Sequence, residues 1–120
     1  MSEVYVLSNI AMPGMVKVGH SYSAEARARQ LSAATGVPCE FEVAYAQETD
    51  VPADCEAIAH ELLSDLRVNA RREFFYTKSA TAAKAVQTAA LLALWNRASS
   101  EARQEFLGRI DSPLMDKRWA

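Results

Sequence analysis

Two short β-type runs joined by a Pro-Gly turn open the chain and constrain its fold most strongly. Residues 3–8 and residues 15–19 alternate in the period-two pattern of sheet strands, and Met12-Pro13-Gly14 supplies the turn between them. This arrangement predicts an antiparallel hairpin. A helix is expected directly after it, because Ser23 is a good N-cap and Glu25 falls in the first turn, where the helix dipole favours an acid.

Helical and strand-type patterns continue along the rest of the chain. We expect the first helix to end at Thr35-Gly36, and then a strand near residues 41–46, a helix capped by Thr49 or Asp50, an aromatic strand at 74–76, and helices at 79–97 and 99–109. Core positions are expected at Cys55, Ile58, Ala59, Leu62, Leu66, Trp95 and along the alanine-rich helix. The order β-β-α-β-α-β-α-α predicts an α+β fold, in which a small, mostly antiparallel sheet of the hairpin and one or two further strands is packed by helices.

Composition limits the classes of function that fit this chain. Its 120 residues suit one domain with a single core, and a net charge of −2 gives no global basic field for nucleic acid. Cys39 and Cys55 form no metal-binding spacing and fit a reduced, cytoplasmic interior. No apolar run approaches the roughly 18 residues of a membrane span, so no membrane partner is expected.

Five short motifs follow one another in a fixed order after Tyr5. They read KVGHS at 17–21, RARQL at 27–31, TGVP at 35–38, CEAIAH at 55–60 and REFF at 72–75. This series resembles the GIY-YIG nuclease superfamily, and most closely its phage-type branch, which is often described as DNA-binding. The resemblance covers about residues 3–77. It implies a GIY-YIG-like domain at 1–78, and we expect the helices of 79–120 to pack on the same single domain.

The resemblance implies phosphodiester hydrolysis assisted by Mg²⁺ or Mn²⁺. Tyr5 would orient or deprotonate the attacking water, Arg27 would clamp the scissile phosphate, and Glu56 would be the single protein ligand to the metal. Gly19 would mark the strand end at the phosphate. His60 lies one helical turn after Glu56 on the same flank, where it would bind phosphate, protonate the leaving group or position Glu56.

Further residues of the same region are expected to contact DNA. The candidates for phosphate or DNA binding are Gly19, His20, Arg29, Asn69, Arg71 and Arg72, beside the catalytic candidates Tyr5, Lys17, Arg27, Glu56 and His60. No target-recognition domain is visible, so a specificity-conferring protein partner or a homo-oligomer would be needed for selective action. The leading hypothesis is therefore a metal-dependent DNA endonuclease.

Two departures from the family pattern leave other functions open. Lys17 stands where the second tyrosine is usually found, and Leu31 stands where better-known members carry His or Tyr. Both favour a DNA-binding module that has kept the fold and lost the chemistry. A third hypothesis is a protein-interaction domain that uses the C-terminal helices.

Each candidate also has a plainer structural interpretation. Tyr5 would be a packing residue, Lys17 a solvated edge-strand lysine, Arg27 a surface residue, Glu56 a first-turn glutamate and His60 a partly buried structural histidine. Glu73 is interpreted as structural, either paired with Arg71 or Arg72 or bracing the site.

Overall fold

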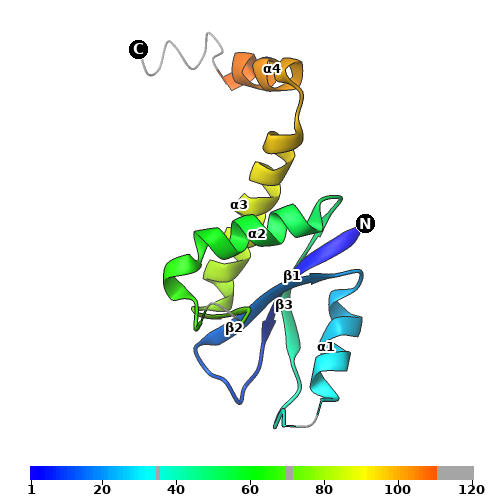
Figure 1. Ribbon diagram of the computed structural model, residues 1–120, viewed down its shortest axis with the longest axis vertical. Coiled ribbons are helices and arrows are strands. Elements are labelled where there is room, and N and C mark those ends of the chain that lie inside the picture. Colours follow the sequence, from blue (N-terminus) through cyan, green and yellow to red (C-terminus); the bar gives the residue numbers. More distant parts are fainter. Residues whose placement is uncertain (35, 70–71, 111–120) are drawn as a thin grey trace.

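The structure, a computed structural model, describes residues 1–34, 36–69 and 72–110 and has the α+β fold that the sequence predicts (Figure 1). Its elements are β1 (Ser2–Ser8), β2 (Met15–Ser21), α1 (Ala24–Ser32), β3 (Glu42–Thr49), α2 (Pro52–Leu62), a 3₁₀ turn (Ser64–Leu66), β4 (Phe74–Tyr76), α3 (Ser79–Arg97) and α4 (Ser100–Ile110). Among the described residues, no helix combines the length and apolar character needed to cross a bilayer.

In the described part of the chain, four strands form one antiparallel sheet in the order β3-β1-β2-β4. The predicted hairpin is confirmed, and its register places Tyr5 opposite Gly19. Within the described chain, β4 is short; it pairs with Met15–Lys17 of β2 and forms one isolated bridge, between Phe75 and Arg67. The second half of β2, which ends at Ser21, therefore has an edge that β4 does not cover, and the candidate site lies there.

The two faces of the sheet pack against different helices, as the period-two alternation of the strands requires. One face packs on α2 and α3 through Val4, Val6, Val16, Val18 and Phe75. The other face packs on α1 and the segment before β3 through Tyr5, Leu7, Ala24, Ala28 and Phe41. The hairpin strands are thus held between helices on both sides, which places residues from β1, α1 and α2 near one edge (Figure 1).

The start of α1 agrees with the sequence analysis, whereas its end does not. Ser23 is the N-cap and accepts a hydrogen bond from the Ala26 amide at 3.2 Å. The helix ends at Ser32, before the predicted Thr35-Gly36, and Thr35 lies outside the described residues. The Ser32 hydroxyl donates to the Ala28 carbonyl at 2.6 Å and accepts from the Phe41 amide at 2.8 Å. This side chain ties the helix end to the segment before β3, which the helical pattern did not reveal.

The predicted cap of α2 is wrong by one or two residues. Val51 is the N-cap, and Thr49 is the last residue of β3. The Thr49 hydroxyl accepts a hydrogen bond from the Val51 amide at 3.1 Å. Pro52 follows in the first turn, where a missing N–H costs nothing.

Part of the predicted core is also wrong. Leu62 and Leu66 are exposed, and Leu63 is buried in their place. Leu63 follows the buried Cys55 and Ala59 at four-residue spacing, and its amide still donates to the Ala59 carbonyl. In α3 the buried residues are Ala82, Val86, Ala89, Ala90 and Ala93, while Leu91, Leu92 and Leu94 are exposed. Trp95 is partly buried, with its ring 5.5 Å from that of Phe106. Small side chains therefore form the inner face of α3.

Candidate functional site

A polar pocket of about 330 Å³ lies beside the free half of β2. Its lining residues are Tyr5, His20, Ser21, Arg27, Gln30, Glu56 and Glu73. Three of the predicted catalytic residues, Tyr5 from β1, Arg27 from α1 and Glu56 from α2, are therefore brought together in one hollow. These residues are far apart in the sequence. They meet because α1 packs on one face of the sheet and α2 packs on the other.

Tyr5 lines the pocket, and its ring depends on the absence of a side chain at Gly19. The Tyr5 side chain is only 2% exposed and lies over Gly19 on the neighbouring strand. A Cβ atom at Gly19 would lie 2.6 Å from the Tyr5 hydroxyl and 3.0 Å from Glu73 Oε2. Glycine is needed here because the tyrosine ring occupies the space of a side chain. The phosphate contact expected of Gly19 stays a prediction.

We expect Gly19→Ala to lower the free energy of unfolding by about 1–3 kcal/mol, since a buried ring and a carboxylate must shift to admit the new methyl group. Urea denaturation followed by circular dichroism measures this change. Gly108→Ala is the matched control, because nothing lies within 4 Å of the added Cβ in α4. The control should be unchanged or more stable by about 0.5–1 kcal/mol. Equal stabilities for both variants would contradict the packing of Tyr5 on Gly19.

The Tyr5 phenol is protonated at neutral pH. Burial raises the pKa of Tyr5 above its ordinary value of 10.0, and the charge of Glu73 acts in the same direction. Hydrogen bonding to Arg27 lowers this pKa but does not cancel the effect of burial. In this state Tyr5 is a hydrogen-bond donor, and its use as a base would need another positive charge beside it.

Arg27 presents an exposed guanidinium to the pocket. Its Nη1 atom donates to Gln30 Oε1 at 3.2 Å, and among the described residues no carboxylate forms an ion pair with it. A guanidinium in this condition can bind two phosphate oxygens at once. Arg29, on the same helix, lies apart from the pocket, is 76% exposed and pairs with Glu25 at 3.8 Å. The structure thus separates these two arginines into a pocket residue and a surface residue.

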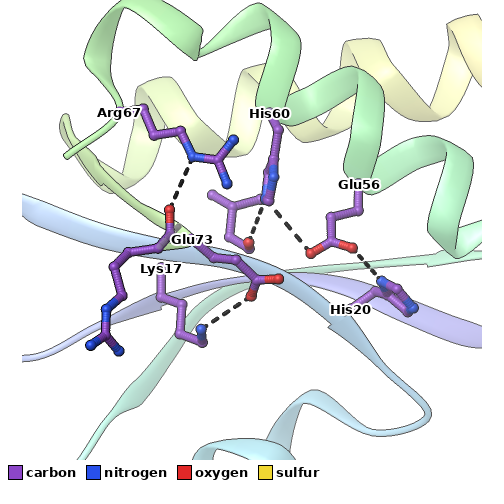
Figure 2. Close-up of polar contacts among 8 residues, drawn as sticks. Lys17, His20, Glu56, His60, Arg67 and Glu73 are labelled. Atoms are coloured by element: carbon purple, nitrogen blue, oxygen red, sulfur yellow. Dashed lines mark hydrogen bonds and ion pairs between the residues drawn. The ribbon is translucent and has the colours of Figure 1, made fainter. Parts of the chain in front are cut away.

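Glu56 lies between two histidines, as Figure 2 shows. Its Oε2 atom is 2.5 Å from His20 Nδ1, and its Oε1 atom is 3.6 Å from His60 Nε2. The same His60 nitrogen donates to the Val18 carbonyl at 2.7 Å. His60 therefore lies behind Glu56 and ties α2 to β2 at Val18, whose amide donates to the Glu73 carbonyl just before β4. Of its predicted roles, this geometry suits the positioning of Glu56.

Lys17 and Glu73 form an ion pair that the sequence analysis missed. Lys17 Nζ donates to Glu73 Oε2 at 3.1 Å (Figure 2). The same nitrogen lies 5.2 Å from the centre of the Phe74 ring. The Lys17 side chain is 13% exposed, so the interpretation as a solvated edge lysine is wrong. Glu73 pairs with Lys17 rather than with Arg72, and its carboxylate braces the pocket. Glu73 belongs to the REFF motif, and this motif was the sequence signal that could have marked Glu73 as a site residue.

The pKa values of the two pocket carboxyl groups, Glu56 and Glu73, are shifted in opposite directions. Burial and the charge of Glu73 raise the pKa of Glu56 above its ordinary value, although His20 opposes the shift. Burial would also raise the pKa of Glu73, but the hydrogen bond and charge of Lys17 outweigh it and lower that pKa below its ordinary value. Glu73 is therefore the firmly ionised member of the pair, and Glu56 is the group that a nearby cation would stabilise most.

The other predicted DNA-binding residues lie in different places. His20 lines the pocket, with its side chain 39% exposed. Asn69 and Arg72 belong to the loop before β4, where the Arg72 amide donates to the Asn69 carbonyl at 3.3 Å. Arg67 Nε holds the same loop by donating to the Arg72 carbonyl at 3.0 Å (Figure 2). Arg71 lies outside the described residues.

Comparison with known proteins assigns the family. The family model of the T5orf172 domain matches residues 3–90, from β1 into α3, and this range contains every residue that lines the pocket. No curated protein and no solved structure gives a significant match. The chain belongs to the T5orf172 domain family, a phage-associated family of the nuclease and DNA-binding type.

Proposed function

We propose that this protein is a metal-dependent DNA endonuclease of the GIY-YIG type. The observation that carries the proposal is the shared pocket of Tyr5, Arg27 and Glu56, three side chains contributed by three different elements. A phenol, a guanidinium and a carboxylate in one polar hollow provide a water- or phosphate-binding donor, a phosphate clamp and a metal ligand. The family assignment supports an action on DNA.

Arg27 would bind the non-bridging oxygens of the scissile phosphate, because its guanidinium has no carboxylate partner among the described side chains. Tyr5 would donate a hydrogen bond from its buried position in the pocket lining to the attacking water or to a phosphate oxygen. His60 would hold Glu56 in place through the bond between its Nε2 atom and the Val18 carbonyl. Each group thus has a distinct position relative to one phosphate.

A hard divalent cation would bind in the same pocket. Oxygen ligands suit Mg²⁺ and Mn²⁺, and Mg²⁺ is often held by one or two carboxylates while water completes its shell. No cluster of three or more Asp, Glu, His or Cys residues that could ligate a metal occurs among the described residues. Glu56 would therefore be the main protein ligand, with Glu73 beside it. When bound, the cation would stabilise the negative charge that develops on the phosphate.

The direct test is nicking of supercoiled plasmid in Mg²⁺ or Mn²⁺, read on an agarose gel. We expect open-circular product with either metal and none in excess EDTA. Catalytically inactive Glu56→Gln protein, purified by the same procedure, is the control for contaminating nucleases. Nicking that is absent with both metals, or equal in Glu56→Gln protein, would refute the endonuclease.

The ion pair of Lys17 with Glu73 favours one alternative, a DNA-binding module without chemistry. An ammonium group bound to a carboxylate does not replace the second phenol of the family pattern in activating water. This alternative predicts DNA binding that weakens as salt rises, with no nicking in either metal. The plasmid assay, run beside a binding titration, therefore decides between the two functions.

A further inference from the structure

An exposed tyrosine, Tyr22, stands in the chain between two residues that line the pocket, Ser21 and Arg27, and has no role in the proposed chemistry. Tyr22 is 82% exposed, which makes it the most exposed large hydrophobic side chain in the described ranges. It directly follows Ser21, which lines the pocket, and precedes α1, which carries Arg27. A ring exposed at this point of the chain can contact a ligand that binds in the adjoining pocket.

The backbone of Tyr22 is held firmly on both sides. Ser21 is the last residue of β2 and pairs with Glu3 of β1. On the other side, Ser23 caps α1 by accepting from the Ala26 amide, and its own amide donates to the Ser21 hydroxyl at 3.3 Å. An exposed aromatic side chain on a fixed backbone loses little conformational freedom when it binds a flat partner.

Charge alone gives this pocket little affinity for DNA. Its lining carries one arginine against two glutamates, and the whole chain has a net charge of −2. The N-terminus of α1 is already occupied, because the Ala24 amide donates to Glu3 Oε1 at 2.9 Å and Ser23 caps the next turn. Since phosphate neutralisation supplies most electrostatic affinity for DNA, another source is needed, and stacking of bases on aromatic rings is independent of charge.

We propose that Tyr22 stacks on an unpaired base beside the phosphate that Arg27 binds, so that the site prefers a single DNA strand to a continuous duplex. The inference rests on the proposed function, because it takes the pocket as the phosphate site. Bases inside a duplex are already stacked on each other, and turning one outward costs free energy. An unpaired strand presents the face of its base to the ring without that cost.

Fluorescence anisotropy in EDTA, with a labelled 12-nucleotide single strand and the matching duplex, tests the inference on the full chain. We expect Tyr22→Ala to bind the single strand about tenfold more weakly, equivalent to about 1.4 kcal/mol. Its affinity for the duplex should change less than about twofold. Tyr22→Phe should bind like wild type, because the ring rather than the hydroxyl makes the contact. Tyr76→Ala is the matched control, since Tyr76 is 59% exposed on β4 and lies outside the pocket lining.

The outcomes separate this inference from the proposed function. Unchanged single-strand affinity in Tyr22→Ala, an equal loss in Tyr22→Phe, or wild-type preference for duplex would each overturn the stacking role. If Arg27→Ala weakens binding in the same titration while Tyr22→Ala does not, the phosphate site stands and only the inference fails. If wild-type protein binds neither DNA, the proposed function fails and the inference fails with it.

Discussion

Glu56→Gln is expected to lower the initial rate of plasmid nicking by at least about 100-fold. Glutamine keeps the size of the side chain but loses the charge that holds a divalent cation, and removal of a group that stabilises transition-state charge costs about 10²–10³ in rate. Quantified gels over a time course in Mn²⁺ measure the effect. Glu61→Gln is a matched control on the same helix, because Glu61 is exposed and outside the pocket.

The stability of the same variant tests the state of Glu56 independently of activity. Because the folded-state pKa of Glu56 is raised above its ordinary value of 4.5, ionising this group costs stability as the pH rises through the folded-state pKa. Glutamine removes that cost. In EDTA, Glu56→Gln should therefore be at least as stable as wild type at pH 7, and its advantage should shrink as the pH falls toward 4. A large loss of stability at pH 7 would mean that Glu56 is a structural residue.

Arg27→Ala is expected to reduce nicking by about 100-fold or more, because the proposed phosphate site would lose the only arginine among the described residues of the pocket lining. Arg27→Lys should lie between Ala and wild type, since an ammonium supplies charge without bidentate geometry. Arg29→Ala is the matched control on the same exposed helix and should stay within about twofold of wild type. Equal effects of Arg27→Ala and Arg29→Ala would point to general electrostatic attraction and contradict a phosphate clamp at Arg27.

Local patterns predicted the hairpin, the order of the elements and the start of α1. In each case the signal is carried by neighbouring residues, such as the turn at Pro13-Gly14 and the cap at Ser23. The errors arise where distant segments compete with local preference. At the end of α1 the Ser32 hydroxyl accepts from the amide of Phe41, and at the end of α2 it is Leu63 rather than Leu62 that packs into the core with β1, β2 and α3.

The candidate site was partly predictable, because some of its residues belong to local motifs whereas other contacts depend on long-range packing. Motif order pointed to Tyr5, Arg27 and Glu56, and the fold brings these three to one pocket. The pairing of Lys17 with Glu73 could not be read from the sequence, because it depends on how β4 aligns with a strand 56 residues earlier. The bond from His60 to the Val18 carbonyl likewise depends on how α2 packs on a strand 42 residues earlier.

The central claim is that one pocket holds both the metal and the phosphate. A crystal of the wild-type protein soaked in Mn²⁺ and a non-hydrolysable dinucleotide tests it most directly, by anomalous scattering at the manganese absorption edge. We predict a manganese peak at the Glu56 carboxylate, with a phosphate bound by Arg27 in the same pocket. If manganese and phosphate both bind elsewhere and the pocket holds neither, the claim of a shared metal and phosphate site is contradicted.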